Sequence, residues 1–274
     1  MVAALARPES VAEVAEAVRA SSRLFVVGRD AHRDWRLDEA GDSAVLDLGA
    51  LRGVVDIQPA DQVAIVRAGS RVSEVQAELN ARNQSLPYAP FETDDDPTIG
   101  GALSLALPHR LEGACGTWRD WVLGMTVVRA DGAIAKCGSC AVKNVAGYDV
   151  GRLFIGARGA LGVIVEVILK TYPLRALPEP PAPRLSAPKG PRWVQRAPLG
   201  SAGRLSGGAV DRETGTLWAA VGADDELPRI EGDWVVRSGR GRQNLGVLPQ
   251  PELFGRAKTV FDPLAKLNPG AFGE

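Results

Sequence analysis

The residues whose types are best suited to bind a ligand or take part in a reaction lie between positions 143 and 149. The segment Lys143-Asn144-Val145-Ala146-Gly147-Tyr148-Asp149 places several polar groups beside an apolar strand. Lys143 can offset the negative charge of a bound phosphate or ring, and Tyr148 can both stack and donate a hydrogen bond. On residue types alone, the alternative is a surface loop that turns at Gly147.

A pair of glycines, Gly100 and Gly101, precedes a predicted helix and raises the possibility of an anion site. The N–H groups at the start of a helix attract anions, and glycine lets a diphosphate approach the backbone closely. Short glycine pairs are weak motifs, so a tight turn from strand into helix is the simpler explanation on residue types alone.

The three cysteines and two histidines are too few to favour a metal site. Cys137 and Cys140 form a lone CxxC pair and Cys115 is the only other thiol, whereas a zinc or iron–sulfur site normally needs four ligands. A redox dithiol is an alternative, but two cysteines flanking a turn are the preferred interpretation. His32 and His109 cannot build a histidine-rich site, so no metal is expected.

Composition and charge narrow the class of protein. The chain has 274 residues, of which 45% are hydrophobic and 24% charged, as is ordinary for a soluble globular protein. A net charge of -1 does not favour nucleic acid or an anionic membrane as a partner. No apolar run could span a bilayer, and residues 1–8 lack a secretory pattern, so a cytoplasmic location is expected.

Hydrophobic periodicity predicts alternating strands and helices in the first part of the chain. Ser10 and Glu13 have the spacing of a capping box, and Val11, Val14 and Val18 share one face of the predicted helix. A second helix has apolar residues at positions 72, 75 and 79. Strands are predicted at residues 24–27, 45–48, 54–57 and 62–68. This alternation is typical of a domain that mixes helices and strands.

A second group of elements begins near residue 86. A helix is predicted from Gly100 to Leu107, and the Asp131-Gly132 turn predicts a β-hairpin over residues 122–136. Residues 162–172 have the Val and Ile content of a strand, which Pro173 is expected to end.

The last part of the chain differs in composition. Residues 173–198 are rich in proline and lack apolar periodicity, so they are interpreted as a linker or extended crossover. Short strands near 217–221 and 233–236 predict a small antiparallel unit, and a short helix is predicted in residues 251–274. The scattered tryptophans are interpreted as core or interface anchors.

Two motifs together resemble a known family. The segment of residues 142–149 runs on into Leu153-Phe154-Ile155-Gly156 and Gly159-Ala160-Leu161-Gly162-Val163-Ile164, and Pro97-Thr98-Ile99-Gly100-Gly101 lies upstream. These residues resemble the FAD-binding fold of the p-cresol methylhydroxylase and vanillyl-alcohol oxidase type. The sequence Lys-Asn-Val-Ala-Gly-Tyr-Asp is most similar to that of the FAD-binding subunit of glycolate oxidase. The resemblance covers most of residues 8–177 and resumes at residues 248–274.

The resemblance implies which residues would bind FAD. In this family the Thr98–Gly101 segment would contact the pyrophosphate and flavin, and Gly116 would let the backbone pass close to the flavin. Arg119 and Asp120 are expected to form a local ion pair. The set carried over comprises Gly28, Arg33, Thr98, Ile99, Gly100, Gly101, Gly116, Lys143, Asn144, Gly147, Tyr148, Asp149, Gly159, Gly162, Val163 and Ile164.

The loop after the first buried strand departs from the family pattern. The family has Gly-Gly-Gly-Thr-Lys-Arg-x-Trp there, and its amides cradle the pyrophosphate. In residues 28–35 of this chain the first glycine, the arginine and the tryptophan are kept. Arg29 and Asp30 replace glycines and Ala31 replaces the threonine, so Asp30 would place a negative charge beside a phosphate. This departure implies weak or lost FAD binding.

Any bound FAD is expected to be non-covalent. Covalent attachment in the superfamily uses His, Tyr or Cys side chains. His32 lies in the altered loop, and His109 has no recognisable attachment context.

The expected fold is α+β, a two-subdomain FAD-binding fold of the p-cresol methylhydroxylase type with a shortened cap domain. Residues 1–177 would form the FAD-binding domain, with subdomains of about 1–86 and 87–177. Residues 178–247 would be a linker and reduced cap, and residues 248–274 would return to the FAD domain. In catalytic relatives, cap histidines and arginines hold the hydroxy acid. Residues 178–247 contain no histidine, so no catalytic residue is assigned.

The resemblance implies the FAD-binding subunit of a glycolate-oxidase-like 2-hydroxy-acid dehydrogenase. It would work with a catalytic flavoprotein subunit and an iron–sulfur subunit, in the cytoplasm or peripheral to the inner membrane through these partners. The chemistry would be hydride transfer from the α carbon of the acid to flavin N5, followed by electron release to the partner. Two alternatives are a non-catalytic assembly subunit with a degraded flavin site and a free-standing flavin oxidase, which would need a larger cap.

Overall fold

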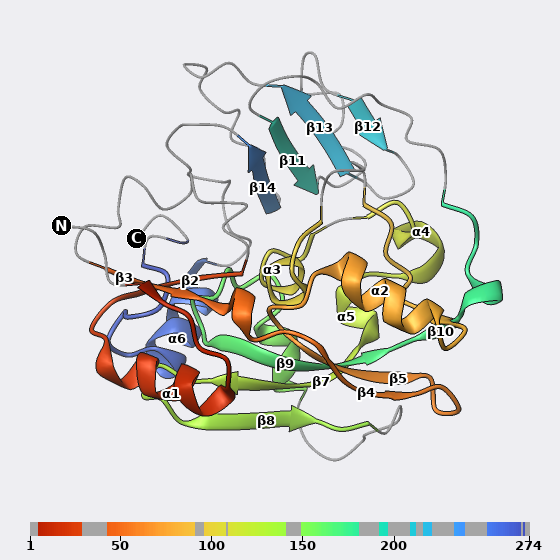
Figure 1. Cartoon of the computed structure of the whole chain (residues 1–274). Helices are drawn as coiled ribbons and strands as arrows, with labels where there is room; N and C mark the ends of the chain where they lie inside the picture. Colours follow the sequence, from red (N-terminus) through yellow and green to blue (C-terminus); the bar gives the residue numbers. More distant parts are fainter. Residues whose placement is uncertain are drawn as a thin grey trace.

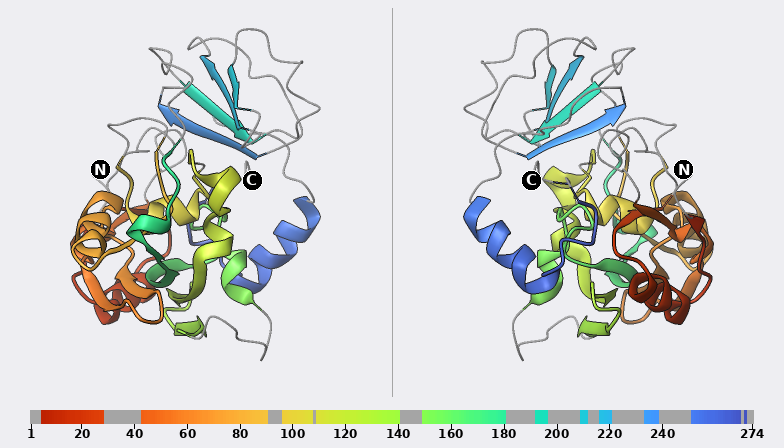
Figure 2. Two further views of the ribbon diagram at one scale, coloured as in Figure 1. Left: turned by 90° about the vertical axis from the view of Figure 1, so that its right-hand side faces the viewer. Right: turned by 90° about the vertical axis from the view of Figure 1, so that its left-hand side faces the viewer.

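The computed structural model describes residues 5–28, 43–90, 96–107, 109–140, 149–180, 251–269 and 271, and the backbone of four strands between residues 192 and 238 (Figure 1). These ranges form a main body of sheets and helices and a separate small sheet, which lies apart from the main body in each view (Figure 2). The architecture is mixed α+β, as expected. Within the described ranges, no helix has the length and apolar character needed to cross a membrane.

The first layer of the main body is a small parallel sheet. The strands β1 (Leu5–Ala6), β3 (Ala44–Asp47) and β2 (Leu24–Val27) pair in the order β1-β3-β2. The helix α1 (Val11–Ala20) connects β1 to β2, two parallel strands that lie on either side of β3. The strands predicted near residues 24–27 and 45–48 are therefore confirmed.

The helix α1 begins where its sequence predicts. The Ser10 hydroxyl accepts a hydrogen bond from the Glu13 N–H at 3.2 Å, which completes the N-terminal cap. Hydrogen bonds from the Glu9 N–H and the Ser10 hydroxyl lower the pKa of Glu13. Val14 and Val18 are fully buried against the parallel sheet and the start of the second sheet.

The second layer is a five-stranded antiparallel sheet. Its strands are β4 (Val54–Gln58), β5 (Val63–Arg67), β9 (Val163–Lys170), β7 (Val122–Val128) and β8 (Ile134–Gly138), in that spatial order. The predicted hairpin is the β7–β8 pair. Because β5 pairs with β9, this sheet joins strands from both sides of residue 86, where the division into subdomains remains a prediction.

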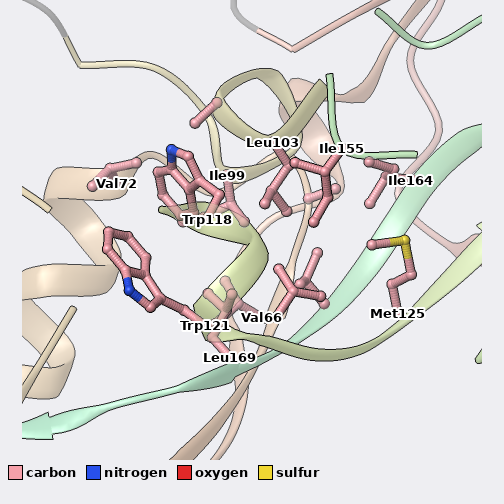
Figure 3. Close-up of a cluster of buried hydrophobic side chains, with 14 of the residues drawn as sticks. Val66, Val72, Ile99, Leu103, Trp118, Trp121, Met125, Ile155, Ile164 and Leu169 are labelled. Atoms are coloured by element: carbon pink, nitrogen blue, oxygen red, sulfur yellow. The ribbon is translucent and has the colours of Figure 1, made fainter. Parts of the chain in front are cut away.

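A large hydrophobic core lies between this sheet and the helices α2 (Val72–Asn80) and α3 (Ile99–Ser104). Figure 3 shows Ile99 of α3 beside Trp118 and Trp121, with the strands of the sheet beneath them. All three side chains are 0% exposed. Burying each large apolar side chain contributes roughly 1.5–3 kcal/mol, so this core holds α3 firmly in place.

Several short elements complete the main body. They are η2 (Leu48–Ala50), β6 (Gln84–Ser85), α4 (Glu112–Cys115), α5 (Trp118–Trp121), η3 (Val150–Leu153), β10 (Tyr172–Pro173) and η4 (Leu174–Ala176).

The separate sheet is antiparallel, as predicted. Its strands β12 (Ala209–Asp211), β13 (Thr216–Ala220), β11 (Arg192–Arg196) and β14 (Asp233–Ser238) pair in that order. The strand β11 lies inside the proline-rich stretch predicted to be a linker, so that interpretation was wrong for residues 192–196. A strand is possible there because no proline lies between Pro191 and Pro198.

The C-terminal part of the chain returns to the main body. The helix α6 (Pro251–Phe261) is followed by a segment that pairs with β2, with Leu267 in parallel register with Leu24. Lys258 and Asp262 form a buried ion pair at 2.7 Å, and the Lys258 ammonium also donates to the Leu267 carbonyl at 2.8 Å. These bonds fix the path of the chain after α6.

Two predicted boundaries were wrong. The helix α3 ends at Ser104 and not at Leu107, because Ala106 has a φ of 46° that a right-handed helix cannot continue. The long strand β9 ends at Lys170, and Pro173 does not end the extended chain. Pro173 belongs to β10, which pairs with β6 in a two-stranded sheet, where proline is tolerated.

Candidate functional site

The structure brings together two of the segments predicted to line a cofactor. Gly28 follows β2, and Thr98 is the N-cap residue of α3. A Cβ atom on Gly28 would collide with the Thr98 Oγ1 atom, so the two backbones can approach this closely only with glycine at position 28. The contact joins the end of the parallel sheet to the start of α3.

The N–H groups at the start of α3 have acceptors within the protein. The Ile99 N–H donates to the Ser70 carbonyl and the Gly100 N–H to the Ala68 carbonyl, both at 2.8 Å. The Gly101 N–H donates to Thr98 Oγ1 at 3.1 Å. These geometries differ from the expectation that free amides await a phosphate at this turn. The tight turn, which was the alternative explanation, accounts for Gly100, because its Cβ would lie 3.0 Å from the Ala68 Cβ.

Gly101 is the most open residue of this turn. Ile99 and Gly100 are buried, whereas Gly101 is half-buried. Among the described atoms, a Cβ on Gly101 would meet only Thr98 Oγ1, at 3.1 Å. Among the described residues, Gly101 is therefore the position of this turn where a ligand could come nearest the backbone, beside the Thr98 hydroxyl.

The closing segment of the motif contacts the C-terminal part of the chain. Gly159 has a φ of 71°, and its Cβ would lie 2.6 Å from the Asn268 Nδ2 atom. Asn268 is bonded in turn to Val26, two residues before Gly28. Sequence reasoning did not include Asn268 in the site, although the C-terminal segment that contains it was part of the resemblance.

Gly162, Val163 and Ile164 lie in the core. Val163 and Ile164 are 1% and 4% exposed and pair with β7, and a Cβ on Gly162 would lie 2.7 Å from the Phe154 ring. Their side chains are therefore occupied by packing. Any contact that they make with a cofactor would have to come from the backbone.

Gly116 belongs to a second cluster, around the short helices α4 and α5. Its φ is 79°, and a Cβ there would lie 2.8 Å from the Asp120 Oδ2 atom. Asp120 accepts hydrogen bonds from the Thr117 N–H and hydroxyl, at 2.7 and 3.0 Å. The Arg119 guanidinium donates to the Ile155 carbonyl at 3.1 Å. The expected Arg119–Asp120 ion pair was therefore wrong, because each side chain is bonded elsewhere.

His109 is enclosed in this second cluster. It is 0% exposed, with its ring centroid 4.7 Å from that of Trp121. The Leu111 N–H donates to His109 Nδ1, which makes Nδ1 the unprotonated nitrogen, and His109 Nε2 then donates to the Gly116 carbonyl at 3.2 Å. Both ring nitrogens are therefore hydrogen-bonded to the backbone, one at Leu111 and the other at Gly116.

Of the polar segment of residues 143–149, the structure describes Asp149 alone. Asp149 forms an exposed ion pair with Arg152, at 2.7 Å. The other motif residues predicted to bind the cofactor lie outside the described residues, as do the altered residues of the loop after β2 and the arginine that this loop shares with the family. These are Lys143, Asn144, Gly147, Tyr148, Arg29, Asp30, Ala31 and Arg33.

The three cysteines are partly buried, and two of them have a raised pKa. Burial raises the pKa of Cys137 and the nearby Asp149 carboxylate raises it further, while burial alone raises the pKa of Cys115. Cys137 lies in β8, and its thiol is 3.6 Å from the Met125 carbonyl oxygen. In the part of the chain that the structure describes, no three His, Cys, Asp or Glu side chains gather where they could hold a metal ion.

Comparison with known proteins defines the class of this chain. Residues 2–138 match the family model of the FAD binding domain. The chain therefore belongs to this family of FAD-binding domains.

Individual relatives agree with this assignment. The chain is similar to glycolate oxidase subunit GlcE of Escherichia coli (strain K12), with 34% identity over 128 residues, which are 47% of this chain and 37% of that protein. It is also similar to D-2-hydroxyglutarate dehydrogenase of Xanthomonas citri pv. viticola, with 32% identity over 186 residues, 66% of this chain and 38% of that protein. The resemblance to a glycolate-oxidase FAD-binding subunit is thus confirmed, although the match spans well under half of each relative.

A solved structure shows the same fold. Alkyldihydroxyacetonephosphate synthase superposes with a TM-score of 0.52 and 16% identity, over 70% of this chain and 34% of that chain. At this identity the likeness concerns the fold alone. It supports the arrangement of the FAD-binding domain described above.

Proposed function

We propose that this chain is the FAD-binding subunit of a glycolate-oxidase-like complex that oxidises a small 2-hydroxy acid. Its proposed partners are a catalytic flavoprotein subunit and an iron–sulfur subunit. When bound, FAD would supply the hydride acceptor for the oxidation. Family membership and the relatives among glycolate oxidase subunits and hydroxy-acid dehydrogenases support this proposal.

The observation that carries the proposal is the contact between Gly28 and Thr98. It joins the end of β2 to the turn that contains Gly101, and these are two of the segments that the resemblance assigns to the cofactor. Gly101 leaves the outer side of this turn without a side chain. A dinucleotide needs such a close approach to the backbone, so these residues fit FAD.

Purified protein tests the proposal directly. A visible absorption spectrum, recorded before and after incubation with FAD and removal of the excess, would measure the flavin content. We expect flavin absorbance in a fixed ratio to protein, at least after added FAD. Acid precipitation should release all of it, because the proposed binding is non-covalent. Colour that remains in the pellet would contradict that part of the proposal.

A second candidate function is a non-catalytic assembly subunit. Two observations favour it. The amides of Ile99, Gly100 and Gly101 are bonded within the protein, and the loop after β2 has Asp30 where the family has glycine. A colourless preparation that takes up no added FAD, yet still assembles with the partner subunits, would favour this function over the first.

The proposed dependence on a catalytic partner rests on the position of His109. It is the only histidine in the described ranges, it is fully buried, and both ring nitrogens are hydrogen-bonded. It cannot reach a substrate to accept a proton. The base for hydroxy-acid oxidation is therefore proposed to come from a partner subunit.

A further inference from the structure

The side chain of Asn268 bridges two segments that are far apart in sequence. Its Oδ1 atom accepts the Val26 N–H, and its Nδ2 atom donates to the Arg158 carbonyl, both at 2.7 Å. Its backbone N–H donates to the Leu24 carbonyl at 2.8 Å. The same Nδ2 atom lies against Gly159, where only glycine leaves room for it. One amide therefore fixes the spacing between β2 and residues 158–159.

These bonds complete a closed ring. The Arg158 N–H donates to the Ser104 carbonyl at 2.8 Å, at the end of α3. The helix leads back from Ser104 to Thr98, and Thr98 lies against Gly28. From Gly28, β2 returns to Val26, where Asn268 closes the circuit. We call this the Asn268 ring: residues 26–28, residues 98–104, residues 158–159 and Asn268.

Six residues predicted to contact FAD lie on this ring, namely Gly28, Thr98, Ile99, Gly100, Gly101 and Gly159. Asn268 itself belongs to the last part of the chain, which follows the separate sheet and α6 (Figure 1). Its φ of 40° is in the left-handed region, where asparagine is one of the few tolerated side chains. Both its amide groups are used within the ring, so its role differs from that of a residue that touches the cofactor.

We propose that Asn268 is a positioning residue for the cofactor site. By holding β2 and residues 158–159 together, it sets the spacing at which the ring receives FAD, and the site is complete only when the C-terminal segment has docked. This inference rests on the proposed FAD-binding function.

Two substitutions of Asn268 remove different numbers of its side-chain hydrogen bonds. Asn268→Asp keeps an oxygen for the Val26 N–H but replaces the donor to the Arg158 carbonyl with a second acceptor, so that bond is lost and repulsion takes its place. Asn268→Gly removes both side-chain bonds and accepts the positive φ without strain. Both variants keep the backbone bond to Leu24.

Amide hydrogen exchange gives a test that does not need FAD. In both variants we expect exchange to accelerate by about tenfold in peptides that cover residues 24–28 and 156–160, because local openings there lose their bonds. Exchange in α2 (Val72–Asn80) should stay as in the parent, which separates a local effect from general destabilisation. Unchanged exchange in the ring peptides would overturn the proposal.

FAD titration tests the functional part. We expect the Kd for FAD to rise by about tenfold in Asn268→Asp and further in Asn268→Gly. The matched control is Val75→Ala, which opens a cavity in α2 outside the ring and should lower the melting temperature with an unchanged Kd. An unchanged Kd in the Asn268 variants, or an equal loss in Val75→Ala, would overturn the positioning role. A parent chain that binds no FAD would instead overturn the proposed function itself.

Discussion

Gly101 offers the most direct test of the cofactor site at the scale of a single residue. Gly101→Asp places a side chain and a negative charge where a pyrophosphate is proposed to approach, so we predict that it abolishes FAD uptake. The measurement is flavin absorbance per protein after incubation with FAD and gel filtration. The control is Gly101→Ala, which adds one methyl group and no charge and favours the helix. A folded Gly101→Asp protein with the parental flavin content would show that the site lies elsewhere.

The cysteines allow a prediction from pKa. Burial, and then the Asp149 carboxylate, raise the pKa of Cys137, so at any given pH less of it is thiolate than of an ordinary thiol with a pKa of about 8.5. We predict slow alkylation of Cys137 at pH 7, with the rate rising only as the pH passes the ordinary thiol range. The raised pKa also means that the neutral thiol is favoured in the folded state. The contribution of the Cys137 thiol to the stability of the folded state is therefore present below the ordinary thiol pKa. It is lost as the pH rises through the raised pKa.

Mass spectrometry of the labelled peptide measures the alkylation rate. The control is the same chain in urea, where Cys137 should react at the rate of an exposed thiol. Faster labelling of the folded chain than of the unfolded chain at pH 7 would indicate an activated thiol. That result would favour the redox dithiol over a structural role for Cys137 and Cys140.

At the scale of the element, the loop after β2 is where FAD affinity can be raised. We predict that replacing Arg29 and Asp30 by glycine and Ala31 by threonine tightens FAD binding. Removing a like charge beside a phosphate is worth about 1 kcal/mol or more in a partly buried site, and the glycines restore backbone freedom. Titration of the apo-protein measures the gain. A matched control changes Arg29 and Ala31 but keeps Asp30, and it should recover less affinity.

The variant with all three loop substitutions could also bind FAD with the same affinity as the parent. That result would show that the loop does not face the phosphates, or that the amides of α3 limit binding instead. The Ile99, Gly100 and Gly101 amides are already bonded within the protein, so the second reason would favour the assembly subunit.

The elements that were predictable from sequence are those whose signal is local. The capping box at Ser10 and Glu13 and the apolar face at Val14 and Val18 define α1, and the Asp-Gly turn defines the β7–β8 hairpin. Long-range pairing was not predictable in the same way. The two-residue strand β10 exists only because Gln84 and Ser85 lie opposite it, and nothing in residues 172–173 indicates that partner.

The resemblance predicted residues for the candidate site, but the sequence could not predict the contacts among them. Gly28, Thr98 and Gly159 followed from a resemblance, yet glycine at position 28 is explained by the Thr98 side chain, which is 70 residues away in sequence. The role of Asn268 was missed for the same reason. A hydrogen bond between residues 26 and 268 leaves no periodicity or spacing signal in the sequence.

At the scale of the whole molecule, the C-terminal segment forms hydrogen bonds to two separate elements of the main body. The Lys266 ammonium is buried and donates to the Val18 and Ala130 carbonyls, both at 2.9 Å, so it joins α1 to the β7–β8 hairpin. The separate sheet precedes this segment in the chain. The described residues after α6 thus contact α1 and β2 of the main body. The assignment of residues 248–274 to the FAD-binding domain remains a prediction.

We predict that oxidation of a 2-hydroxy acid requires the partner subunits in addition to this chain. The only histidine in the described ranges is sealed beside Trp121, and residues 178–247, proposed as a reduced cap, contain no histidine to accept a proton from a hydroxy acid. We therefore predict negligible oxidation of glycolate or lactate by the purified, FAD-loaded chain with an artificial dye acceptor, and robust turnover when the partner subunits are added. The control is the partner subunits assayed without this chain. Robust turnover by this chain alone would contradict the subunit proposal and would favour a free-standing flavin oxidase.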